Sequence, residues 1–276
     1  MPFTLADVNA VIERLWPLSG AEDWDAPGVL SGDFTAEIGS ILLAVDAVAE
    51  TVDEAIDSGH GLLLSHHPLL LRGVKTVAEN RYKGALLARL IRADCALIAA
   101  HTNADVVAEG TSAVLADRLG LLQTQPIVPS AASDASPGTG IGRVGILTEP
   151  TTLGRLARSL AEILPATASG VRVAGDFDAP IKTVSLCGGA GDAYLAEPAV
   201  TASDVYITAD LRHHPASEAR EQARLGGGPA LIDVSHWASE WLWLDTAARQ
   251  LREALPGIRV EVSELRTDPW DFAVVQ

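Results

Sequence analysis

The sequence predicts an α/β protein made of two similar lobes. Short apolar runs alternate with amphipathic segments along most of the 276 residues, which is typical of strands alternating with helices. Single hydrophobic cores stop growing at about 250 to 300 residues, so this length suits two modest lobes. A weak internal repeat supports two lobes, because His66-His67-Pro68 and His213-His214-Pro215 both follow an apolar run.

The boundary between the lobes is expected in a segment rich in serine, alanine, glycine and proline. Such a composition buries too little apolar surface to order itself well. The predicted organisation is therefore a first lobe at 1–128, a linker at 129–140 and a second lobe at 141–276.

Each predicted element is either a short apolar run or a longer segment with one apolar face. The strands expected in the first lobe are residues 41–45, 62–64 and 96–100, and the helices are 48–57, 82–92 and 111–119. The strands expected in the second lobe are residues 144–147, 184–187, 205–208, 231–234 and 258–262, and the helices are 153–163, 215–224 and 237–255.

Charge and cysteine content narrow the class of protein. A formal net charge of -16 repels phosphate backbones and anionic lipid, so nucleic-acid and membrane-surface binding are disfavoured. The two cysteines, Cys95 and Cys187, lie in apolar runs and are expected to be buried free thiols. The first fifteen residues resemble neither a signal peptide nor a membrane anchor, so a cytoplasmic location is expected.

All seven histidines lie beside other residues that can bind metal. They occur in four places, which are His60 with Ser65-His66-His67-Pro68, His101-Thr102-Asn103-Ala104-Asp105, His213-His214-Pro215, and His236-Trp237-Ala238-Ser239-Glu240. Neutral imidazoles combined with carboxylates, without thiolate, suit a divalent manganese, iron, cobalt, nickel or zinc ion at a catalytic site. The sequence therefore predicts a metal site.

The positions of these residues favour two neighbouring ions. His66 and His67 follow a predicted strand, and adjacent side chains on extended backbone point to opposite sides, so the pair suits two ions better than one. His101 with Asp105, and His236 with Glu240, are each four residues apart and share a face if a helix begins there. Thr102 and Asn103 could cap such a turn.

Each pair taken alone also arises in ordinary exposed helices. Together, the five or six donors with two carboxylates suffice for two ions roughly 3.5 to 4 Å apart, bridged by a carboxylate and a water.

The remaining histidines and the glycine-rich segment have simpler interpretations. His60 is expected at a helix end, where a cation favours the dipole. His213 and His214 line a pocket or an interface, or are satisfied structural residues. The segment 188–192 is expected to be a tight turn, because it lacks the Lys-Ser/Thr ending of a P-loop.

The three metal-binding segments resemble the motifs of the NGG-one-interacting-factor-three-like family, also labelled GTP cyclohydrolase I type 2 homologues. The resemblance spans nearly the whole chain and continues in Trp24-Asp25-Ala26-Pro27-Gly28-Val29, Gly188-Gly189-Ala190-Gly191-Asp192, Tyr206-Ile207-Thr208-Ala209-Asp210 and Thr267-Asp268-Pro269-Trp270. It implies two similar α/β lobes, a dinuclear metal site in the cleft between them, and a toroidal homohexamer. The chain resembles the short form of the family, without its large inserted domain.

The resemblance also implies a role for each ligand. His67 and Asp105 would bind one divalent ion, His66 and His236 the other, and Glu240 would bridge both. His101 would lie in or beside the coordination sphere and could shuttle a proton. The chain departs from the family pattern at Ser235, where glycine is usual, and at Ala26, where asparagine is common.

These features lead to the expectation of a metal-dependent hydrolase that acts on a nucleotide or a related small molecule. Two ions would lower the pKa of water and polarise the substrate. Two alternatives stay open, a ring that handles metal or binds partners without turnover, and a two-metal phosphoesterase.

Overall fold

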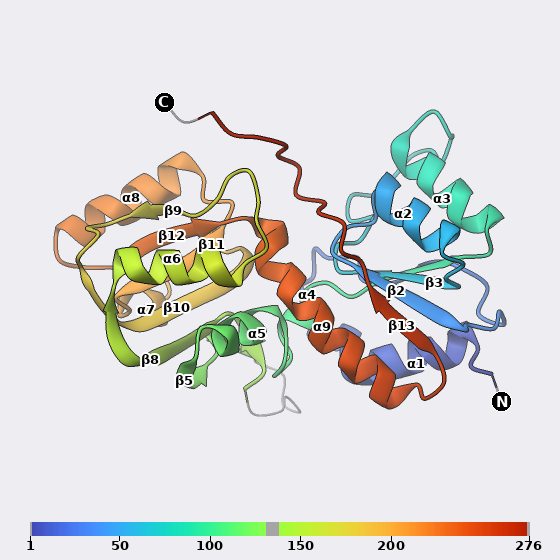
Figure 1. The fold of residues 1–276 in the computed structure, drawn as a ribbon, viewed down its shortest axis with the longest axis horizontal. Helices are drawn as coiled ribbons and strands as arrows, with labels where there is room; N and C mark the ends of the chain where they lie inside the picture. Colours follow the sequence, from blue (N-terminus) through green and yellow to red (C-terminus); the bar gives the residue numbers. More distant parts are fainter. Residues whose placement is uncertain (1, 131–137, 275–276) are drawn as a thin grey trace. The chain divides into compact units, whose positions relative to one another are not determined.

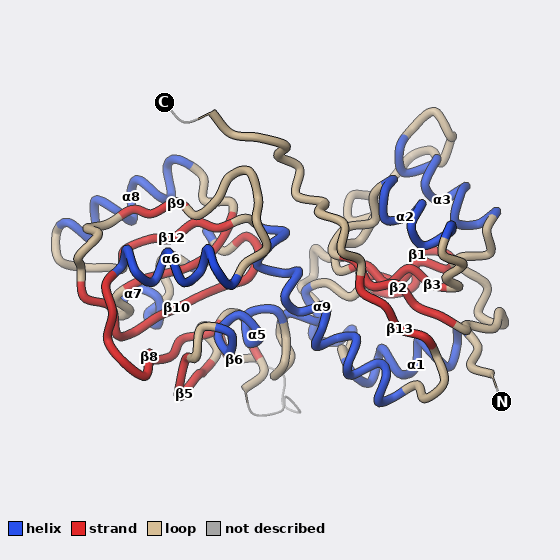
Figure 2. Tube along the Cα trace, in the orientation of Figure 1, coloured by secondary structure: helices blue, strands red, loops and turns tan. Residues whose placement is uncertain are grey.

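The computed structural model describes residues 2–130 and 138–274, and the chain divides into two compact units. The first unit comprises residues 1–104 and 244–267, and the second comprises 105–243 and 268–276. Helices and strands alternate in both, as Figure 2 shows, so the predicted α/β class is confirmed. Among the described residues, no helix is long and apolar enough to cross a membrane.

The first unit is built on a five-stranded sheet with the order β1-β4-β3-β2-β13. Its strands are β1 (Gly28–Ser31), β2 (Ser40–Ala44), β3 (Leu62–Ser65), β4 (Ala96–Ala99) and β13 (Arg259–Val262). All neighbours are parallel except β1, which runs antiparallel to β4. The carboxyl ends of β2, β3 and β4 therefore meet at one edge of the sheet.

Helices cover both faces of this sheet (Figure 1). They are α1 (Leu5–Leu15), α2 (Ala49–Asp57), α3 (Tyr82–Arg92) and the carboxyl-terminal part of α9 (His236–Ala254), and the one-turn helix α4 (Thr102–Asp105) follows β4. A capping box between Thr4 and Asp7 starts α1. The Trp16 indole N–H, just beyond α1, donates to Gln250 of α9 at 3.2 Å.

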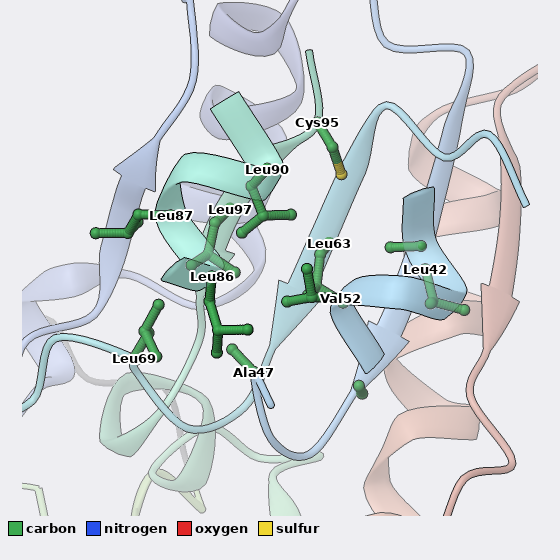
Figure 3. Close-up of a cluster of buried hydrophobic side chains, with 12 residues drawn as sticks. Leu42, Ala47, Val52, Leu63, Leu69, Leu86, Leu87, Leu90, Cys95 and Leu97 are labelled. Carbon is green, nitrogen blue, oxygen red and sulfur yellow. The ribbon is translucent and has the colours of Figure 1, made fainter. Parts of the chain in front are cut away.

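A leucine-rich core fills the space between the sheet and the pair α2 and α3 (Figure 3). Leu63 and Leu97 from the strands, Val52 from α2 and Leu90 from α3 are fully buried. Cys95 lies in the same cluster, and burial raises the pKa of its thiol to about 11. The packed core fixes the strand ends that carry the polar residues described below.

The second unit is built on a six-stranded sheet with the order β5-β8-β10-β11-β12-β9. Its strands are β5 (Leu121–Gln125), β8 (Arg143–Thr152), β9 (Arg172–Ala174), β10 (Pro180–Ala190), β11 (Val205–Ala209) and β12 (Ala230–Val234), and a small separate sheet joins β6 (Val128–Pro129) and β7 (Gly140–Ile141). The central strands β10, β11 and β12 are parallel. As in the first unit, the carboxyl ends of the parallel strands meet at one edge.

The helices of the second unit are α5 (Thr111–Arg118), α6 (Leu153–Ile163), α7 (Pro198–Thr201), α8 (His213–Arg224) and the start of α9. In α6, Thr152 caps the first turn by accepting from the Arg155 N–H, and Leu153, Leu156 and Leu160 form its buried face. Cys187 is buried beside Tyr206, and burial raises the pKa of this thiol to about 12. The prediction of two buried free thiols is confirmed.

The units divide at a different place from the boundary predicted at 129–140. Residues before that segment belong to the second unit, because β5 pairs with β8 and extends the second sheet. The chain therefore divides after Ala104, and α9 also contributes residues to both units. Residues 131–137 of the predicted linker lie outside the described residues.

Candidate metal centre

Three histidines gather at the carboxyl ends of β3 and β4 in the first unit. His66 and His67 follow β3 directly, and His101 comes two residues after β4 ends. The ring centroids are 5.1 Å apart for His66 and His67, 5.2 Å for His66 and His101, and 5.4 Å for His67 and His101. One ligand nitrogen from each ring lies within 4.8 Å of the other two, so this group could hold a metal ion.

The bend of the chain after β3 explains how two adjacent histidines reach one place. The strand ends at Ser65, and the N–H groups of His66 and His67 donate to Ala44 and Val45 at 2.9 and 2.8 Å. The Ser65 hydroxyl donates to the carbonyl of His67 at 2.8 Å. These bonds hold the segment against the end of β2, where the alternation of an ordinary strand no longer applies.

Each of these rings has its Nδ1 atom beside an oxygen that can only accept a hydrogen bond. The partner of His66 is the Ala100 carbonyl at 2.8 Å. Asp46 contacts Nδ1 of His67 at 2.7 Å, and Asp25 contacts Nδ1 of His101 at 2.7 Å. Each Nδ1 must therefore carry the hydrogen, which puts the lone pair of the neutral ring on Nε2, as in metal-binding histidines.

Asp25 is the most tightly held of these acceptors. Its side chain is fully buried and also accepts from the N–H and hydroxyl of Thr102. Burial by itself raises the pKa of Asp25, but the hydrogen bonds from His101 and Thr102 outweigh burial and hold the pKa well below its usual range. The Asp25 carboxylate beside Nδ1 of His101 is therefore negatively charged.

The second unit brings His236 and Glu240 together at the start of α9. The helix begins at His236, so the two side chains lie one turn apart, and Nε2 of His236 is 2.9 Å from a carboxylate oxygen of Glu240. Asp210, which follows β11, contacts Nδ1 of His236 at 2.8 Å. Burial lowers the pKa of His236, but the two carboxylates outweigh burial and raise the pKa well above its usual value. The position between the Glu240 and Asp210 carboxylates therefore strongly favours a positive charge.

Gly189 leaves the space that Glu240 occupies. It lies near the end of β10 with φ +69, and a Cβ atom there would come within 2.4 Å of a Glu240 carboxylate oxygen and 3.1 Å of His236 Nε2. The Gly189 N–H donates to the Ser239 hydroxyl at 2.9 Å, and that hydroxyl donates to the His236 carbonyl at 2.8 Å. Residues 188–190 of the predicted tight turn therefore belong to the end of β10, where Gly189 forms one wall of the Glu240 site.

The remaining predicted ligand, Asp105, ends α4 and accepts a hydrogen bond from the Thr111 hydroxyl at 2.5 Å. The predicted turn between His101 and Asp105 is present, and Asn103 caps it by accepting from the His101 N–H at 2.9 Å. Ser235 has a structural role, because its hydroxyl accepts from the Ala238 N–H at 3.2 Å and caps α9.

The donors in both units fit a divalent transition metal. They are imidazole nitrogens and carboxylate oxygens, the ligand types that suit manganese, iron, cobalt, nickel and zinc. All four rings have Nδ1 held by a carbonyl or carboxylate, which is the usual support of metal-bound histidine. Each unit on its own therefore presents a group of side chains prepared for a cation.

The other histidines lie elsewhere. His60 follows α2 and is buried, and burial lowers the pKa of its ring, which disfavours the cation expected at the helix end. Its Nε2 is 3.1 Å from Glu261. His213 and His214 are exposed at the start of α8, with ring centroids 5.2 Å apart, and His213 lines a surface cavity of about 420 Å³.

Sequence reasoning missed the three aspartates that hold the histidines. Asp46 comes two residues after β2 and Asp210 directly after β11, the kind of position by which His66 and His236 were recognised. Searching for carboxylates just after the carboxyl ends of strands would have found Asp46 and Asp210. Asp25 lies in a loop, and the Trp24-Asp25 motif was its only signal in the sequence.

Replacing Gly189 with alanine is expected to lower metal occupancy, because the new methyl group would displace the Glu240 carboxylate. Gly59→Ala is the matched control, since Gly59 has a similar φ of +66 and nothing lies within 4 Å of its Cβ position. Elemental analysis after metal loading gives the ions per chain. A Gly189→Ala protein that is folded and as fully loaded as the Gly59→Ala protein would contradict this assignment.

The chain is similar to known proteins over nearly its whole length. The family model Duf34/NIF3 (NGG1p interacting factor 3) matches residues 3–269. A Streptomyces coelicolor protein named GTP cyclohydrolase 1 type 2 homolog is 47% identical over 270 residues, which cover 96% of this chain and 93% of the relative. A Clostridium perfringens protein of the same name is 31% identical and covers 97% of this chain and 99% of its own length.

Solved structures show the same fold. The crystal structure of the Staphylococcus aureus hypothetical protein SA1388 has a TM-score of 0.88 at 29% identity and covers 99% of this chain and 100% of its own. A Bacillus cereus protein related to NIF3 also has a TM-score of 0.88, at 22% identity, and covers 99% of both chains. The family expected from the sequence is thus confirmed, and the chain belongs to the DUF34/NIF3 family.

Proposed function

We propose that this protein is a hydrolase that depends on two divalent metal ions and acts on a nucleotide or a related small molecule. The observation that carries the proposal is the support of four histidines through Nδ1, which prepares each Nε2 to bind metal. The name GTP cyclohydrolase 1 type 2 homolog, carried by relatives, indicates hydrolytic opening of the guanine ring as the reaction to test first.

In this proposal His67 and Asp105 would hold one ion and His66 and His236 the other, with Glu240 serving both. Two ligand carboxylates would reduce the charge of two divalent ions from +4 to +2, and the carboxylates of Asp25, Asp46 and Asp210, which contact three of the histidines, would offset it further.

When bound, the two ions supply Lewis acidity and lower the pKa of water towards roughly 7, so that hydroxide is available at neutral pH. The protein contributes the proton transfer. His101 is the proposed proton carrier, because the buried Asp25 carboxylate fixes its Nδ1–H. The pairing leaves Nε2 of His101 as the atom that takes up and returns the proton.

Separate replacement of His67 and Glu240 by alanine is expected to reduce the metal content from about two ions per chain, because each variant loses a ligand. His214→Ala is the control, since His214 is an exposed histidine on α8. Elemental analysis of protein loaded with manganese, iron or zinc measures the change. Metal content equal to that of the His214→Ala protein in both variants would refute the ligand assignment.

Replacing His101 with glutamine is expected to leave both ions bound and to lower turnover by about 10² to 10⁴, the usual contribution of a proton-transfer group. Turnover is measured with a panel of nucleotides and phosphoesters, following loss of the guanine chromophore or release of phosphate. Loss of an ion in this variant would make His101 a ligand. Turnover in metal-free wild-type protein would refute the proposed mechanism, and phosphate release alone would identify the protein as a phosphoesterase.

A further inference from the structure

An exposed tryptophan lies beside the histidine cluster of the first unit. Trp24 is 60% exposed, although tryptophan side chains are on average among the most buried. Its ring centroid is 5.8 Å from that of His101, with the ring planes at 81°. His101 itself is buried, so Trp24 carries the aromatic surface of this cluster out to solvent.

The backbone around Trp24 is held by the same network that holds His101. The Asp25 N–H donates to the Glu22 carbonyl at 3.0 Å, and the Glu22 N–H donates to the Thr102 hydroxyl at 3.0 Å. The buried Asp25 carboxylate binds His101 and Thr102. Trp24 therefore lies between two anchored residues, and the indole is presented from a fixed support.

A fixed and exposed indole is suited to stacking against a flat ring. Aromatic side chains bind bases in this way, and the contact tolerates different bases because each has a π face. The flanking residues Glu22, Asp23 and Asp25 are acidic, so an anionic group would be repelled at this point. The chemistry of the segment therefore favours an uncharged planar ring over a phosphate.

We infer that Trp24 is a binding platform for a planar heteroaromatic ring, of the nucleobase type, belonging to the molecule handled at the histidine cluster. The inference rests on the proposed function, because it takes the ring to be part of the same substrate. It assigns recognition of the ring to one residue that is neither a metal ligand nor a proton carrier.

The test compares Trp24→Leu with Trp24→Phe in the metal-loaded full chain. Guanosine and adenosine serve as probes, because they present the ring without phosphate, and isothermal titration calorimetry measures their binding. Trp24→Leu is expected to weaken binding by about 10-fold or more, and Trp24→Phe to stay within about 5-fold of wild type. Tyr82→Leu, which removes an aromatic residue that is 68% exposed at the start of α3, should bind like wild type.

Metal content, measured on the same samples, separates the possible failures. Unchanged nucleoside binding by Trp24→Leu would overturn the inference. Loss of metal together with binding in that variant would overturn it too, by showing that Trp24 supports His101. A wild-type protein that holds two ions and binds neither nucleoside would refute the platform but leave the metal site standing. The wild-type chain could instead hold no metal and still bind a nucleoside, with binding lost in Trp24→Leu. That result would refute only the proposed hydrolase.

Discussion

The hydrogen bond from each Nδ1–H to a fixed oxygen is the interaction on which the candidate site depends. An imidazole ring that can rotate and change tautomer offers its lone pair in many directions, whereas one held at Nδ1 offers it only from Nε2. Ala100 and Asp46 supply this support for His66 and His67, and Asp210 supplies it for His236. The ring orientations are therefore set by the protein before any ion binds.

The sheets explain why such supports exist in both units. Adjacent strands run parallel in each, four in the first unit and three in the second, so their carboxyl ends deliver polar residues to one edge. In the first unit, Asp46 follows β2 and its partner His67 follows β3. In the second, Asp210 follows β11 and His236 follows β12. Acceptor and histidine thus come from neighbouring strands, and the rigid sheet fixes the distance between them.

The sequence predicted those elements that have a strong local pattern. The bounds of α3 and α6 agree with the predicted residues 82–92 and 153–163, because each has one apolar face. The edge strands β5 and β9 were missed, since most of their side chains are exposed and give no alternating pattern. Asp25 and Gly189 were also beyond local reasoning, because each acts on a residue at least 47 positions away in the chain.

The most direct test of the account is the tautomer of each supported histidine, measured by nitrogen-15 NMR of the imidazole rings in metal-free protein above pH 8. His66, His67 and His101 are predicted to carry the hydrogen on Nδ1 and to show an unprotonated Nε2. Addition of zinc should shift the Nε2 resonances of His66 and His67 while Nδ1 stays protonated. Hydrogen on Nε2 in the metal-free protein, or Nε2 resonances of His66 and His67 that zinc leaves unchanged, would contradict the account.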